Sequence, residues 1–299
     1  MNKHQKFRPF YYFLDTVAHE LQLTDADILY HYTSPEGLKS IVETNKIWFS
    51  EIHYLNDKSE IIYTYNLLSK ILEKTKDIVP EFKKSLETYI QSHIYSRPFK
   101  IDRKPSQNIF VASFSHASDE LSLWNYYTKS DKKYGYNIGF KTNFFIEKFS
   151  GPNAFRHGYC GKVIYNKRIQ EEKIRDALFK YQNNFIDTKD YDEQMYLIDL
   201  FMDFIEILSL FFKHKAFESE KEYRLIITQS ERESKFSVKY RTQNGIFIPY
   251  IEMDFTTDII KKITASPLVD TSLCDGVEQF LKDHGIRHRV IASKIPIRY

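Results

Sequence analysis

The chain has 299 residues, enough for one large domain or two small ones, and its 42% hydrophobic and 28% charged residues are ordinary for a soluble globular protein. Its 43 Lys and Arg against 40 Asp and Glu give a net charge of +3, which neither requires nor excludes a nucleic-acid partner. Because the two cysteines lie far apart and the basic N-terminus lacks an apolar signal-peptide segment, we expect a cytoplasmic protein with no disulfide framework, no metal site and no membrane partner.

Hydrophobic periodicity and turn residues predict helices and strands along the whole chain. The clearest helix start is Ser34 followed by Pro35, because serine caps a first turn and proline fits the first helical position. The predicted helices cover residues 10–23, 35–45, 58–76, 81–95, 121–127, 167–186, 192–213 and 277–284. The predicted strands cover residues 28–32, 47–49, 108–115, 136–140, 162–165, 223–228, 246–250, 259–265 and 289–292.

These elements alternate irregularly, and the strands gather after residue 220. That order favours an α+β fold over a doubly wound parallel sheet. We expect a single domain over residues 1–299, with a helical N-terminal region and helical segments at about 58–96 and 167–213. A glycine-rich phosphate loop is not predicted, since the chain has only nine glycines and none lies in that pattern.

Two blocks in the first half of the chain carry polar side chains suited to a ligand. His31 and Thr33 end a strand before a helix N-terminus, where directed hydrogen bonds and unpaired backbone N–H groups suit an anionic or nucleotide-like ligand. Ser113 and Ser115 lie two apart on a strand, so both hydroxyls should share a face. A structural role fits both blocks as well, with His31 satisfied locally and the strand end capping the next helix.

A later block brings charged residues into a strand of strong β formers. Glu220, Glu222 and Arg224 alternate, which predicts that they share one face of an extended segment. Such charges are costly in a buried strand unless they are paired or used. The block is therefore either a structural Glu–Arg pair or a carboxylate that Arg224 holds in a cleft, where it stabilises an oxocarbenium-like centre.

Taken together, the motifs resemble a bacterial family, the domain-of-unknown-function 2971 family, whose name carries no activity. The resemblance runs from about residue 28 to the end of the chain. It rests on Tyr30-His31-Tyr32-Thr33-Ser34, Ile47-Trp48-Phe49-Ser50, Leu55-Asn56-Asp57, Ser113-Phe114-Ser115, Trp124, Gly139-Phe140 and the spaced residues Lys215, Phe217, Glu220, Glu222 and Arg224.

The chain also resembles, more loosely, the ADP-ribosyltransferases. These enzymes share a split, mainly antiparallel sheet with a His or Arg on the first strand, a Ser-x-Ser or Tyr on a middle strand and a Glu on a later strand. His31, Ser113-Phe114-Ser115 and Glu220-Lys221-Glu222 match these marks in order. The resemblance implies NAD as substrate, Glu222 as catalytic carboxylate and Glu220 as the group that orients the acceptor. The implied NAD site consists of His31, Tyr32, Thr33, Ser113, Ser115, Trp124, Tyr136 and Arg224.

The resemblance further implies transfer of ADP-ribose to a protein or to RNA or DNA, as in a toxin or antiphage effector, with an antitoxin or inhibitor protein as a further partner. Two basic segments, 100–104 and 287–289, leave a nucleic-acid acceptor open. We expect His31, the Ser113–Ser115 strand and Glu222 to converge on one pocket. Placement of His31 and Glu222 on opposite sides of the sheet would contradict this expectation.

Two other functions stay open. The first is a non-catalytic nucleotide- or nucleic-acid-binding module, in which Arg224 pairs with a glutamate and His31 is structural. The second, ranked last because no metal-ligand spacing supports it, is a metal-dependent nuclease that uses Asp57, Glu60, Glu220 and Glu222.

Overall fold

The computed structural model of the chain describes residues 28–54, 59–92, 108–127, 134–150, 158–229, 235–243, 245–270, 272 and 274–296. The chain divides into two compact units. The helical unit takes its described residues from 59–92 and 163–217, and the sheet unit takes its described residues from the rest. The helix predicted at 10–23 and the basic segment 100–104 lie outside the described residues, and the single domain stays a prediction.

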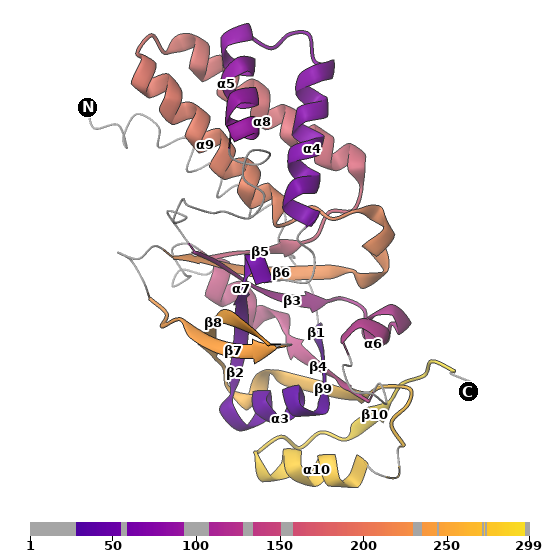
Figure 1. Cartoon of the computed structure of the whole chain (residues 1–299). Coiled ribbons are helices and arrows are strands. Elements are labelled where there is room, and N and C mark those ends of the chain that lie inside the picture. Colours follow the sequence, from indigo (N-terminus) through magenta and orange to yellow (C-terminus); the bar gives the residue numbers. More distant parts are fainter. Residues whose placement is uncertain are drawn as a thin grey trace. The chain divides into compact units, whose positions relative to one another are not determined.

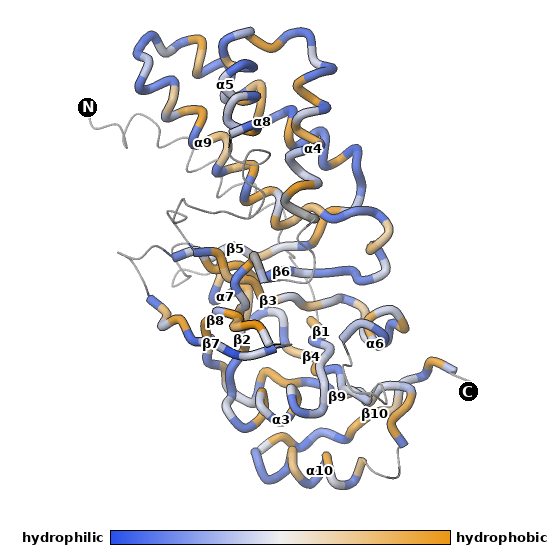
Figure 2. The backbone as a smooth tube through the Cα atoms, in the orientation of Figure 1, coloured by the Kyte–Doolittle hydropathy of each residue, from blue (hydrophilic) through white to orange (hydrophobic). Residues whose placement is uncertain are grey.

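The helical unit contains four described helices, which correspond to the four predicted in this part of the chain. They are α4 (Ser59–Lys74), α5 (Pro80–Ile90), α8 (Lys167–Asp187) and α9 (Tyr191–Ser209), and Figure 1 shows them packed side by side. Asn166 and Asp190 cap α8 and α9 by accepting hydrogen bonds from first-turn N–H groups. Hydrophobic and hydrophilic residues alternate around the helix turns (Figure 2), so each helix buries one face in a shared apolar core.

None of the described helices combines the length and the apolar composition needed to cross a membrane.

The sheet unit is built on ten described strands in one sheet. They are β1 (Ile28–Thr33), β2 (Lys46–Glu51), β3 (Asn108–Ser115), β4 (Tyr136–Lys141), β5 (Gly158–Lys162), β6 (Glu222–Gln229), β7 (Lys239–Gln243), β8 (Ile246–Asp254), β9 (Ile260–Ala265) and β10 (Val290–Ala292). All the pairings described are antiparallel except that of β9 with β10. The predicted mixture of helices with a mainly antiparallel sheet is therefore confirmed.

The sheet forks at β3. One edge of β3 pairs with β6 over its whole length, from Asn108 opposite Gln229 to Ser115 opposite Glu222. The other edge is divided, because Val111 pairs with Ser50 of β2 while Ser115 pairs with Tyr30 of β1. Two arms leave this edge in Figure 1, β2–β8–β7 and β1–β4–β9–β10.

Helices and short turns complete the sheet unit. They are α3 (Pro35–Thr44), α6 (Leu121–Tyr127), α7 (Thr142–Ser150), α10 (Cys274–Asp283) and the 3-10 turns η1 (Ile52–Tyr54), η3 (Lys215–Glu220, which begins in the helical unit) and η4 (Thr257–Ile259). The start of α3 is as predicted, since Ser34 Oγ accepts a hydrogen bond from Gly37 N at 3.1 Å and Pro35 is the first helical residue.

Three elements differ from prediction. Strand β7 was not predicted because its residues are mostly polar and exposed, which leaves no hydrophobic pattern. Helix α7 follows β4 with no turn residue between them. The strand predicted at 162–165 is displaced: β5 covers Gly158–Lys162 and shares only Lys162 with the prediction, because the chain passes into the helical unit at Val163.

Register defines two faces of the sheet, since directly opposed residues of antiparallel strands share a face and successive residues alternate. The Glu222 face carries Tyr30, Ser115 and Glu222. The His31 face carries His31 and Phe114, and with α3, α7 and α10 it encloses the main apolar core of the unit.

Candidate functional site

The three strands that carry the predicted catalytic marks are neighbours, in the order β6, β3, β1. Ser115 lies opposite Glu222 on one side and opposite Tyr30 on the other. Ser113 lies opposite Arg224 in the same ladder, so it shares this face. The structure therefore brings Ser113, Ser115, Glu222 and Arg224 together on the Glu222 face, as expected.

His31 lies on the opposite face of the sheet. Its ring packs against Phe114, with 5.6 Å between ring centroids, and its Nδ1 is 3.2 Å from the carbonyl oxygen of Ser113. Burial lowers the pKa of His31, and the bond to Ser113 opposes that shift. The expected convergence of His31 with Glu222 is wrong, because side chains alternate along β1 and Tyr30 occupies the register position beside Ser115.

Two further residues assigned to the NAD site share the face of His31. Thr33 and Tyr136 are opposed between β1 and β4. The Thr33 side chain lies against Gly37 at the start of α3, where a methyl group on Gly37 would overlap Thr33 Oγ1. Tyr136 is buried in the main core, and this burial raises the pKa of its phenol.

Glu222 and Arg224 form a buried ion pair. The guanidinium donates from Nε to Oε1 at 2.7 Å and from Nη2 to Oε2 at 3.0 Å. The two side chains are only 6% and 4% exposed, respectively. The carboxylate thus has both oxygens engaged within its own strand and presents neither to solvent.

Glu220 does not share the strand with Glu222, contrary to expectation. It ends the 3-10 turn η3, and Lys221 takes a left-handed backbone conformation with φ 43° before β6 begins. The Glu220 carbonyl accepts a hydrogen bond from Ser115 Oγ at 2.5 Å. The expected alternation of Glu220, Glu222 and Arg224 is therefore wrong, because an extended segment requires negative φ at every residue.

The remaining predicted residues are engaged in packing. Tyr32 packs edge-on against Trp124 with 4.6 Å between centroids, and its hydroxyl donates to Ala117 O at 2.8 Å. The Trp124 indole N–H donates to Asp119 Oδ1 at 2.8 Å. Both rings belong to the small apolar cluster that attaches α6 to the Glu222 face. Their positions fit a structural role, and no aromatic platform for a nicotinamide ring results from them.

His116 lies at the end of β3, beside the start of β6. Burial, with Lys162 and Lys221 nearby, lowers the pKa of this histidine to about 4. Its ring meets Tyr223 edge-on at 5.7 Å between centroids, and within the described part of the chain its Nε2 is buried with no hydrogen-bond partner. His116 is therefore neutral at neutral pH.

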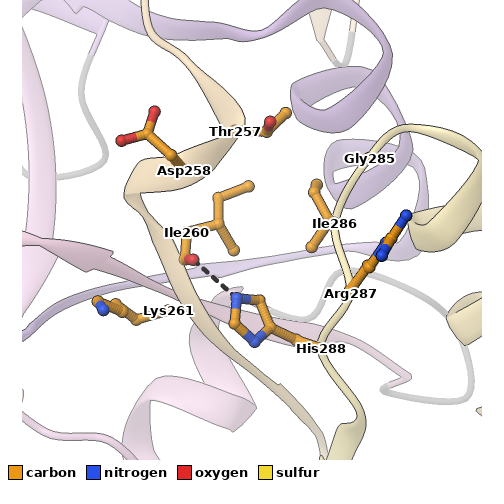
Figure 3. Close-up of a pocket in the computed structure, with 8 residues that line it drawn as sticks. All are labelled: Thr257, Asp258, Ile260, Lys261, Gly285, Ile286, Arg287 and His288. Carbon is orange, nitrogen blue, oxygen red and sulfur yellow. Dashed lines mark hydrogen bonds between the residues drawn. The ribbon is translucent and has the colours of Figure 1, made fainter.

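A cavity of about 270 Å³ opens between η4, the start of β9 and the segment that follows α10. Figure 3 shows Lys261 and His288 along its lower side and Arg287 at the right, with Thr257 and Asp258 above. His288 Nε2 lies 3.0 Å from the carbonyl oxygen of Ile260, which fixes the ring at the cavity wall. The side chains of Lys261, Arg287 and His288 are all exposed.

The sequence indicated only part of this cavity. The basic run at 287–289 was a candidate for nucleic-acid contact, whereas Thr257 and Lys261 were not singled out. The two lysines at 261 and 262, just before the apolar end of β9, are the signal that was available.

Within the described residues, no group of three or more His, Cys, Asp or Glu side chains is placed to hold a metal ion. Asp57, a candidate ligand for the nuclease alternative, lies outside those residues, as does the side chain of Glu60.

Comparison with known proteins gives one match. No curated protein and no solved structure matches the chain. Residues 123–225 match a family described as "Protein of unknown function (DUF2971)". The matched stretch includes Trp124, Gly139-Phe140 and the Glu222–Arg224 pair, whereas His31 and Ser113 precede it. The family expected from the motifs is thus confirmed over residues 123–225, about a third of the chain.

Proposed function

We propose that the sheet unit is a non-catalytic nucleic-acid-binding module that holds phosphates at the cavity beside η4. The observation that carries this proposal is the cluster of exposed Lys261, Arg287 and His288 around one opening, with exposed Arg289 next in sequence. Cationic side chains at a concave surface attract the phosphate backbone. Asp258 on the other side of the opening also lies 3.9 Å from Lys141, which offsets part of its charge.

The state of Glu222 supports binding over catalysis. A carboxylate that stabilises a reacting centre must reach the substrate. Both oxygens of Glu222 are held by Arg224, and the pair is buried. His31, the other essential mark of the transferase prediction, lies on the opposite face of the sheet. These are the features expected of the module, in which Arg224 pairs with a glutamate and His31 is structural.

The test is a salt-dependent binding measurement. Fluorescence anisotropy of labelled single-stranded RNA and double-stranded DNA is followed between low and physiological salt, with Arg287→Gln, Lys261→Gln and the parent protein. Each variant should reduce the slope of log affinity against log salt by about 1, because one phosphate contact is lost. Lys39→Gln on α3 removes the same charge from an exposed ion pair and should leave the slope unchanged. Parent and cavity variants with equal slopes would refute the proposal.

A second candidate is an NAD-dependent ADP-ribosyltransferase acting on a protein or nucleic acid. It is supported by one observation: the strands bearing the three marks are adjacent in the order β6, β3, β1, at the fork of the sheet. In this candidate Arg224 must release Glu222, and Glu220 or Glu222 acts as the catalytic carboxylate.

The assay for the second candidate is release of nicotinamide from NAD. Glu222→Gln should reduce the rate by about two to three powers of ten, comparable with loss of one electrostatic stabiliser. An unchanged rate in Glu222→Gln moves the role to Glu220. Absence of any release by the parent protein leaves the binding module as the function.

A further inference from the structure

Arg241, in the edge strand β7, is a half-buried cation without an anionic partner among the described residues. Its Nη2 donates to Ser50 Oγ at 3.0 Å and its Nη1 donates to Gln243 Oε1 at 3.1 Å, and both acceptors are neutral. Its Nε is buried and meets no acceptor in the described structure. Desolvation lowers the pKa of Arg241, and the neighbouring Tyr250 opposes part of that shift.

Two aromatic rings lie beside this guanidinium. Trp48 and Tyr250 pack with 4.5 Å between centroids and 35° between planes. Tyr250 is directly opposite Ser50, the residue that Arg241 contacts, and Trp48 lies two residues before Ser50 on the same face of β2. The indole is 38% exposed, a large value for a tryptophan within a strand. Tyr250 is buried, so a cation and the exposed Trp48 ring, which packs on Tyr250, share one patch of the Glu222 face.

The charges around the patch leave it open to an anion. The nearest carboxylate in register is Glu252, opposite Trp48. It is bound by Lys239 at 2.8 Å and by Lys46 at 3.1 Å. Desolvation raises the pKa of Glu252, but the two lysines together outweigh it and hold the pKa below its usual value. Lys46 also binds Asp254 at 3.0 Å, so two lysines offset two carboxylates. Because Glu252 is engaged by both lysines, it offers Arg241 no pairing and an incoming anion little repulsion.

We propose that Arg241, Trp48 and Tyr250 form a mononucleotide-binding site, in which the guanidinium holds the phosphate and the exposed Trp48 ring, supported by the buried Tyr250 ring, stacks on the base. A guanidinium removed from water is costly unless it meets an anion, and its planar fork matches the oxygens of a phosphate. Trp and Tyr rings stack on nucleobases without regard to sequence. The proposal depends neither on the cavity beside η4 nor on transferase activity.

The two tryptophans of the chain make this site directly observable. Trp124 is 3% exposed, so Trp48 is the ring that a ligand reaches. Trp124→Phe leaves Trp48 as the sole reporter of tryptophan fluorescence. AMP should quench this fluorescence to saturation. Adenosine, which lacks the phosphate, and inorganic phosphate, which lacks the ring, should each bind at least about tenfold more weakly, because charge-assisted bonds and stacking both contribute.

Arg241→Gln should weaken AMP binding at least about tenfold and leave the adenosine affinity unchanged, because only the phosphate contact is lost. Arg168→Gln on α8 is the matched control, since it removes the same charge from an exposed ion pair. If Trp124→Phe does not fold, equilibrium dialysis of labelled AMP against the parent protein, Arg241→Gln and Arg168→Gln gives the same comparison.

Equal affinity for AMP and adenosine, no saturable binding of AMP, or equal binding by the parent and Arg241→Gln would each overturn the proposal. Tighter binding of phosphotyrosine than of AMP would also overturn it, in favour of a phosphopeptide. Arg287→Gln, which tests the nucleic-acid proposal at the cavity beside η4, should leave AMP binding unchanged, so the two proposals fail separately.

Discussion

Arg224 and Glu222 lie two residues apart on β6, and the guanidinium of the first holds both carboxylate oxygens of the second at 2.7 and 3.0 Å. Alternation along a strand places both side chains on one face, where they point the same way. The pair is buried, so each charge depends on the other to offset its lost hydration. The Glu222 carboxylate therefore has a structural role, and it can act on a substrate only if Arg224 releases it.

Removing Glu222 or Arg224 should leave the other buried charge without its partner. We expect Glu222→Gln and Arg224→Ala each to lower the free energy of unfolding by roughly 3–5 kcal/mol. Urea or thermal denaturation measures the loss. The double variant Glu222→Met/Arg224→Met should recover part of it, because apolar residues of similar size need no partner. A Glu222→Gln protein with unchanged stability and abolished nicotinamide release would instead favour the transferase.

The pKa of His116 makes stability depend on pH. The folded-state pKa of about 4 lies below the ordinary histidine value of 6.5, so the folded protein binds fewer protons than the unfolded chain between these values. The stabilisation is complete above pH 6.5 and is lost as the pH falls toward 4. The lowered pKa of His31 acts in the same direction.

We expect His116 to contribute about 1–2 kcal/mol to this loss, less than the full shift implies because the ring is only half-buried. Urea denaturation of the parent protein and of His116→Gln at pH 7.5, 6 and 5 measures the contribution. The difference in stability between the two proteins should shrink or reverse as the pH falls. Parallel pH profiles would show that His116 does not titrate on unfolding.

Two glycines in helices should respond in opposite ways to alanine. A methyl group at Gly37 would overlap Thr33 Oγ1, so Gly37→Ala should lower the unfolding free energy by about 1–3 kcal/mol. At Gly276 in α10 an added Cβ meets nothing within 4 Å. Gly276→Ala should therefore raise the unfolding free energy by about 0.5–1 kcal/mol, because alanine has the higher helix propensity. Thermal melts distinguish the two. Less than additive losses in Thr33→Ala/Gly37→Ala would identify the overlap as the cause, whereas strict additivity would exclude it.

The Tyr32 hydroxyl joins two backbone groups. It donates to Ala117 O at 2.8 Å and accepts from Glu120 N at 3.1 Å. Tyr32→Phe keeps the ring against Trp124 but leaves both groups without this partner, so we expect a loss of about 1–3 kcal/mol in denaturation experiments. Loss of the ring interaction as well, as in Tyr32→Ala, should cost more, and equal losses in the two variants would show that the ring contributes nothing beyond the hydroxyl.

By itself, the sequence determined most of the local structure. The cap at Ser34 with Pro35 begins α3 as predicted, the apolar stripes of the four helices in the helical unit were readable, and runs of β formers marked β3, β6 and β9. These features depend on residues a few positions apart, whose geometry is fixed by the helical or strand repeat. The spacing of Glu222 and Arg224 allowed two interpretations, and the structural ion pair that is observed was one of them.

Only the tertiary structure decided which side chains meet. The faces of β1, β3 and β6 depend on register between segments about 85 to 120 residues apart, and a shift of one residue in β1 would move His31 to the Glu222 face and Tyr30 away from it. The left-handed Lys221 took Glu220 out of the strand, although no glycine marked the position. The patch of Arg241, Trp48 and Tyr250 joins three strands that pair only in the folded sheet, so no short-range pattern contains it.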